Sequence, residues 1–146
     1  MGESSRYDIR RNVQIEFPRE RFTTSVEVKV LDGDTYELLE HPGFAEANYG
    51  DVISAVEMQP GHLQFRRVIR KSPLTMAAYG LSSRVNVESQ ELSDILEKVM
   101  QTGGFWQCDL GGLLWVFFDP GRFDPRGQID AIQGVSPHCG EEMTGW

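Results

Sequence analysis

The sequence predicts an α+β protein in which a small barrel-like β half, residues 13–81, packs on a βαββα half of ferredoxin-like order, residues 82–146. Short runs of alternating apolar and polar residues fill the first half, one amphipathic helical run opens the second, and one strand-sized run near its end is apolar throughout. Residues 1–12 are polar, and we expect them to form a flexible lead.

The first strands are marked by their alternation. Val13–Phe17 alternates apolar and polar residues and is closed by Pro18. In Thr24–Leu31 three valines share one face, which is typical of a half-buried strand, and they are Val26, Val28 and Val30. Residues 32–34 supply a turn, so Thr35–Leu39 is predicted to return as the second strand of a hairpin.

A second hairpin is predicted around Gln59–His62, where proline and glycine favour a turn. Its strands are Tyr49–Met58 and Leu63–Arg70, and Leu74–Tyr79 follows as one more short strand. Five or six strands of this length predict a small barrel.

The second half begins with a helix. Ser89 is a suitable N-cap, and the apolar residues that follow at helical spacing are Leu92, Ile95, Leu96 and Val99. Phe105–Asp109 and Leu113–Phe118 are predicted strands, and the second of these is apolar on both faces, so we expect it to be central and paired on both edges. A short helix is expected over residues 128–133, and residues 136–146 are left unassigned.

One charged residue conflicts with the strand pattern. Arg67 lies between Phe65 and Ile69 on the apolar face of its predicted strand. A buried guanidinium must be paired, so we expect a bond to Asp51 or, nearer the turn, to Glu57. The alternative is a bulge that turns Arg67 outward.

The binding residues that we predict are Asp51, Arg66, Arg67, His41, Trp106 and Trp115. For Asp51 the alternatives are a turn residue that caps its own backbone and a partner for the arginines in a recognition cleft. The two tryptophans are either core residues or exposed contact anchors.

No catalytic residue, metal site or cofactor is predicted. Cys108 could act as a nucleophile with His138 as its base only if the two side chains lie close together in the fold, and nothing in the local sequence supports this. The alternative for Cys108 is a buried structural thiol. The adjacent pair of His138 and Cys139 is no better candidate for a catalytic pair. The two cysteines form no metal-binding pair and are expected to be thiols. The acids of one Pro-Gly loop do not match a calcium loop and are expected to be solvated; they are Asp119, Asp124 and Asp130.

Three segments carry a resemblance to a known family: 36–44, 49–55 and 65–69. Together they resemble a bacterial family known only as domain of unknown function 4265, in which a tyrosine-containing strand leads to an Asn-x-Pro-Phe turn, followed by Gly-Asp-Val-Val and Phe-x-Arg-Val-Val strands. The likeness is best over residues 26–70. The chain departs from the pattern at Glu40, where the family has Asn, and at Gly43, which moves Phe44 one place along. The resemblance implies no activity.

Composition limits the function classes. Of 146 residues 40% are hydrophobic and 25% charged, and the net charge is −8; residues 82–146 carry four basic against ten acidic residues. Such a surface repels nucleic acid and either favours a basic partner or serves solubility. No apolar run approaches the ~20 residues of a membrane helix, and the N-terminus has no apolar signal region. We therefore expect a cytoplasmic protein without nucleic-acid or membrane contact.

Two functions follow from these observations. The first is a non-enzymatic domain that binds a basic protein, for example an immunity protein that neutralises a toxin. The alternative is a small-molecule-binding protein or enzyme whose site lies at the junction of the two halves and draws on Asp51, Arg67, His41 and Cys108.

Overall fold

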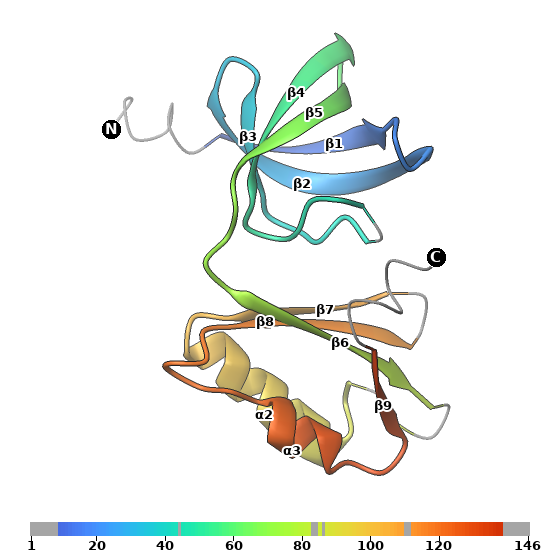
Figure 1. Ribbon diagram of the computed structural model, residues 1–146, viewed down its shortest axis with the longest axis vertical. Helices are drawn as coiled ribbons and strands as arrows, with labels where there is room; N and C mark the ends of the chain where they lie inside the picture. Colours follow the sequence, from blue (N-terminus) through green and yellow to red (C-terminus); the bar gives the residue numbers. More distant parts are fainter. Residues whose placement is uncertain (1–8, 44, 83–84, 86, 110–111, 139–146) are drawn as a thin grey trace. The chain divides into compact units, whose positions relative to one another are not determined.

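The chain forms two units, residues 1–72 and 73–146, in a computed structural model (Figure 1). The structure describes residues 9–43, 45–82, 85, 87–109 and 112–138, without the side chain of His138. The elements, in order, are β1 Ile9–Phe17, β2 Phe22–Asp32, β3 Thr35–Leu38, β4 Val52–Gln59, β5 His62–Arg70, β6 Thr75–Leu81, α2 Gln90–Gln101, β7 Phe105–Asp109, β8 Leu113–Phe118, α3 Arg126–Asp130 and β9 Val135–His138. This is the mostly β, α+β protein that the sequence predicts.

The first unit is a closed barrel of five strands in the order β1-β2-β3-β4-β5. Each strand pairs antiparallel with the next, so the fifth runs in the direction of the first, and β1 and β5 close the barrel as a parallel pair. Both predicted hairpins, β2–β3 and β4–β5, are confirmed. The expected lead is corrected in part, because Ile9–Asn12 pair with β2 and belong to β1; residues 1–8 lie outside the described residues.

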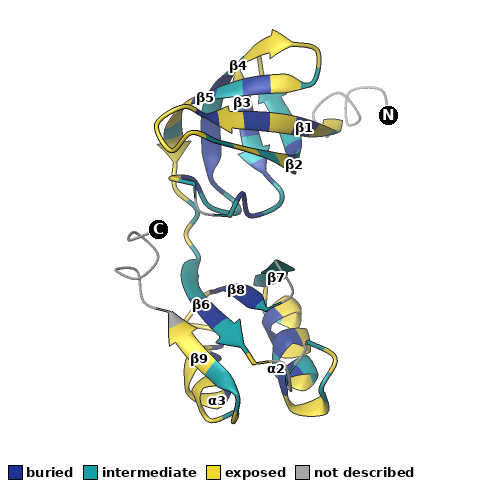
Figure 2. Cartoon of the chain, turned by 90° about the vertical axis from the view of Figure 1, so that its right-hand side faces the viewer, coloured by how far each residue is buried: buried dark blue, intermediate teal, exposed yellow. Residues whose placement is uncertain are grey.

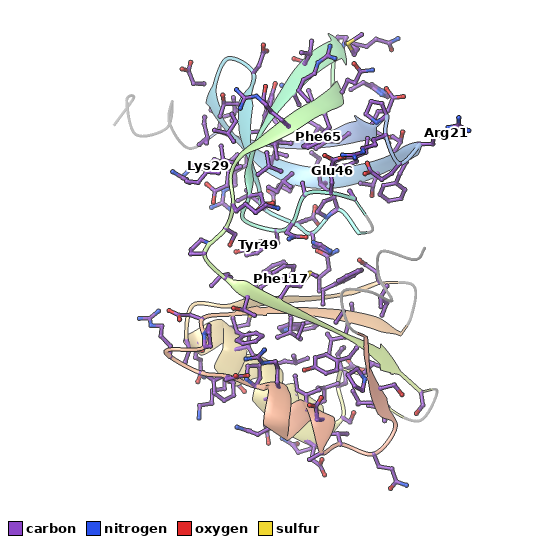
Figure 3. All side chains as sticks on the ribbon, in the orientation of Figure 1. Arg21, Lys29, Glu46, Tyr49, Phe65 and Phe117 are labelled. Atoms are coloured by element: carbon purple, nitrogen blue, oxygen red, sulfur yellow. The ribbon has the colours of Figure 1, made fainter. Side chains whose placement is uncertain are left out.

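The barrel core lies where the inward-facing residues of the strands meet. Val26 and Val28 are buried, and Val30 is partly buried against them, as the alternation in β2 predicts. The ring centroids of Phe17 and Phe65 lie 5.0 Å apart, and Phe65 is in the barrel interior (Figure 3). Burial of these apolar side chains holds the five short strands together.

The second unit is a four-stranded antiparallel sheet in the order β7-β8-β6-β9. β8 pairs with β6 and with β7, and all six of its residues are buried, so the predicted central strand is confirmed (Figure 2). α2 packs three buried residues on one face of this sheet, beside the β8 residues Leu114, Val116 and Phe118; the helix residues are Leu92, Leu96 and Val99.

Three boundaries differ from the sequence expectation. β6, placed with the barrel by its position in the sequence, pairs with β8 and β9, so the chain divides after Ser72 rather than after residue 81. α3 spans Arg126–Asp130 and therefore begins earlier than predicted. Part of the unassigned tail forms β9, because Val135–His138 pair with β6.

Candidate functional site

Asp51 is a buried backbone cap. Its side chain is 1% exposed, and its carboxylate accepts hydrogen bonds from the backbone N–H of Asn48 at 2.9 Å and of Ser72 at 2.7 Å. The first bond closes the turn into β4, as the capping alternative predicted, and the second ties the end of the unit to the same turn. Both carboxylate oxygens are thereby occupied by backbone donors.

Arg67 is exposed, so the expected buried ion pair with Asp51 or Glu57 is wrong. Ser54 pairs with Arg67 and Ala55 with Phe65, which leaves Arg66 as an extra residue in β5. This bulge is the alternative that the sequence left open: one inserted residue reverses the phase of the alternation, and both arginines face solvent.

Glu57 has a different partner. Its Oε2 accepts a hydrogen bond from Nη2 of Arg11 at 2.8 Å and another from the backbone N–H of Gly61 at 2.8 Å. The Arg11 guanidinium lowers the pKa of Glu57, and the carboxylate raises the pKa of Arg11. This pair joins β1 to the β4–β5 hairpin on the barrel surface.

His41 lies in the connection between β3 and β4 and is only 3% exposed. The backbone N–H of Tyr49 donates to its Nδ1 at 3.4 Å. Burial lowers the pKa of His41 to about 4, against the opposing effect of a hydrogen bond with the backbone of Gly43. The neutral imidazole joins the two ends of this connection, which is a structural role.

The two tryptophans belong to the fold of the second unit. Trp115 is 1% exposed, and its Nε1–H donates to Oδ2 of Asp109 at 3.1 Å. Trp106 is half-buried and packs against the core between α2 and the sheet. An exposed contact anchor is therefore not found at Trp115, where burial and a satisfied indole N–H mark a core residue.

Cys108 packs against the same core as Trp106. Burial, with the nearby Asp109 carboxylate, raises the pKa of its thiol, which opposes formation of a nucleophilic thiolate. Cys139 and the side chain of His138 lie outside the described residues. Across the described part of the chain no group of three or more His, Cys, Asp or Glu side chains is arranged to hold a metal ion.

The carboxylates of the loop after β8 accept hydrogen bonds from residues close to them in sequence. Oδ1 of Asp119 accepts from the backbone N–H of Gly121 at 3.0 Å. The carboxylate of Asp124 accepts hydrogen bonds from Nε and Nη2 of Arg126, at 2.9 and 2.7 Å. These bonds lower the pKa of Asp124. The Arg126 guanidinium also lies over the Phe118 ring, 5.0 Å from its centroid. Asp119 and Asp124 thus bind groups within their own loop, while the third acid, Asp130, is the last residue of α3.

The exposed face of α2 carries three carboxylates spaced three residues apart, which we call the acidic stripe: Glu91, Asp94 and Glu97. Gln90 donates to Asp94 at 2.7 Å and Gln101 to Glu97 at 3.4 Å, but no described cation pairs with any of the three. Figure 2 shows this exposed side opposite the buried face of α2. The sequence carries a signal for the stripe, because acids at a spacing of three residues fall on neighbouring positions of one helix face.

Met100, 48% exposed, follows the acidic stripe at the last turn of α2. Lys98 lies beside the stripe, but its ammonium is placed over the Phe123 ring, 4.6 Å from the centroid. The surface of α2 thus combines uncompensated negative charge with one exposed apolar side chain. Negative charge of this kind attracts positively charged groups over several ångströms.

The first unit has a shallow cavity of about 210 Å³ beside the β1–β5 seam and the β4–β5 turn. Its lining is polar except for Met58 and Leu63; the other lining residues are Gln14, Glu16, Thr23, Gln59 and His62. None of the binding residues predicted from the sequence lines it.

No helix in the described part of the chain is long and apolar enough to cross a membrane.

Comparisons with known proteins give the fold alone. No protein-family model matches the chain, and no curated protein matches it. A solved structure described as a hypothetical protein from Neisseria gonorrhoeae is similar, with a TM-score of 0.57 and 14% sequence identity, over 89% of this chain and 93% of that one. The resemblance to domain of unknown function 4265 stays a prediction.

Proposed function

We propose that this chain is a cytoplasmic, non-enzymatic domain that binds a basic protein through the acidic stripe of α2. The observation that carries the proposal is that Glu91, Asp94 and Glu97 are exposed together and without a cationic partner in the described part of the chain. The second unit has four basic and ten acidic residues, so its net charge has the same sign as the stripe. An immunity protein that neutralises a basic toxin is one concrete form of this function.

Geometry and electrostatics both support this use of α2. A helix anchored by Leu92, Leu96 and Val99 presents its outer side chains in fixed positions, which limits the entropy lost on binding. Uncompensated charge accelerates encounter with a partner of opposite sign. We further propose that the unit is ferredoxin-like, a proposal supported by the β-α-β-β-α-β element order and the position of β8 between β6 and β7.

The test is capture of partners from the native host with the whole chain as bait, followed by measurement of affinity for the captured protein. The variant Glu91→Gln, Asp94→Asn, Glu97→Gln removes three charges from the acidic stripe. The control Glu16→Gln, Asp32→Asn, Asp34→Asn removes three exposed charges from the barrel. We expect the first variant to lose about tenfold or more in affinity, mainly through the association rate, and the control to lose little. Equal losses in both, or a captured partner that is acidic, would contradict the proposal.

A further inference from the structure

We propose that the second half of β5 is a docking surface for an acidic segment of a partner protein that also carries apolar side chains. The surface is the basic strip, formed by Arg66, Arg67 and Arg70, together with the exposed Ile69 between them. It lies in the first unit and differs in sign from the acidic stripe, so it goes beyond the function proposed for α2.

The arginines of the basic strip are exposed and uncommitted. None of them makes an ion pair or a side-chain hydrogen bond with a residue in the described ranges. The contrast is with Arg11 and Arg126, whose guanidinium groups are bonded to Glu57 and Asp124. A guanidinium binds a carboxylate through two parallel N–H groups, and three of them along one short strand provide several such positions.

The backbone beside the basic strip is also available. β5 pairs with β1 only from His62 to Gln64, and from Phe65 onward it has β4 as its sole strand neighbour within the described ranges. Register shifts leave Arg66 and Ile69 as extra residues opposite β4, so the strand is bent here. An open edge with exposed charges is a place where an extended segment can lie alongside the sheet.

The chemistry of the surface favours an acidic protein segment over nucleic acid. Ile69 is 45% exposed and offers an apolar contact between guanidinium groups. No exposed phenylalanine, tyrosine or tryptophan side chain lies in β5 for bases to stack on. A segment with alternating acidic and aliphatic residues can pair with the arginines and place an apolar side chain against Ile69.

The alternative role for these arginines is protective. Charged residues and bulges on an open strand keep it from pairing with other chains. Under that role the arginines would prevent self-association and bind nothing. The experiment must therefore measure both binding and self-association.

The probe is a short synthetic peptide in which glutamate alternates with valine and leucine, titrated into the isotope-labelled whole chain. We expect amide shifts concentrated in residues 65–71. The variant Arg66→Ser, Arg67→Ser, Arg70→Ser should bind about tenfold or more weakly. The control Arg10→Ser, Arg19→Ser, Arg21→Asn removes three exposed positive charges elsewhere on the barrel and should bind as the parent does.

Four results would overturn the proposal. They are an absence of shifts in residues 65–71 at millimolar peptide, an equal loss of affinity in the control, tighter binding of a single-stranded oligonucleotide of matched charge, and self-association of the serine variant by light scattering without peptide binding by the parent. Circular dichroism verifies that each variant is folded. Since the strip arginines are exposed, their replacement removes no core contact, and Arg67→Ser alone is the fallback if the triple variant is unstable.

Discussion

The carboxylate of Asp51 accepts a hydrogen bond from the backbone N–H of Ser72, 21 residues further along the chain, at 2.7 Å. The turn into β4 and the last residue of the first unit are thereby fixed to one buried side chain. Gly50, at φ +85°, precedes Asp51, and a Cβ atom there would lie 2.9 Å from Oγ of Ser72. The packing around this bond leaves no room for a side chain at residue 50.

Replacement of Asp51 by alanine should destabilise the first unit by about 3 kcal/mol, since two partly buried N–H groups lose a charged acceptor worth about 1.5–3 kcal/mol each. Asp51→Asn keeps one carbonyl oxygen and should cost less. Urea denaturation measures the free energy of unfolding for both variants. Equal stability of Asp51→Ala and the parent would show that water replaces the carboxylate.

The buried His41 predicts a pH-dependent stability. Its pKa falls from 6.5 to about 4 on folding, so the unfolded chain binds the proton more tightly. The free energy of unfolding should be unaffected by this group above pH 6.5, fall as the pH drops from 6.5 toward 4, and lose about 3 kcal/mol in all.

Thermal or urea unfolding across this pH range measures the effect. His41→Gln should flatten the pH dependence between pH 6.5 and 4, and His62→Gln, at an exposed position, is the control substitution. A parent curve that is already flat in this range would mean that His41 titrates normally in the folded chain.

Gly104 allows the end of α2 to approach β8. A Cβ atom there would collide with the carbonyl oxygen of Phe117 and lie 2.8 Å from Cγ1 of Val99. Gly104→Ala should therefore cost about 1–3 kcal/mol through overpacking. Gly127→Ala, where a Cβ atom meets nothing within 4 Å, is the matched control and should be neutral or slightly stabilising. Comparable destabilisation in both variants would argue against the close approach.

The central position of β8 predicts slow amide exchange. Val116 is fully buried and lies opposite Ala77 of β6 and Trp106 of β7. Hydrogen exchange followed by NMR should give β8 among the highest protection in the second unit, comparable with global unfolding. Exchange at Val116 as fast as in the loop around Gly121 would be inconsistent with a strand paired on both edges.

Local patterns predicted most of the elements, because each depends on residues close in sequence. The alternation of β2 and the apolar run of β8 are set by burial on one or both faces. The orientation of Arg67 could not be predicted in this way. The extra residue at Arg66 exchanges the inward-facing and outward-facing positions of β5, and the sequence pattern does not show where such a bulge occurs. The sheet to which β6 belongs could not be predicted either, because it depends on pairing with β8 and β9, which are distant in sequence.

The candidate sites were predicted less completely than the fold. The two alternatives for Asp51 were both visible in the sequence, but the choice depended on the distant N–H of Ser72. The burial of Trp115 depends on the central position of β8, which is set by its pairing with both β6 and β7. The acidic stripe is visible in the spacing of Glu91, Asp94 and Glu97, because a helix places residues three apart on neighbouring positions of one face.

The parallel pairing of β1 with β5 has a consequence for synthesis on the ribosome. The first strand of the unit, β1, completes its pairing only after β5 has been made, since Gln14 pairs with His62 and the Gln14 N–H donates to the carbonyl of Gly61. A nascent chain that stops before residue 62 holds β1 with one edge unsatisfied. Non-local pairing of this kind slows folding. This edge of β1 is thus exposed to other nascent chains and to chaperones until β5 has emerged from the tunnel.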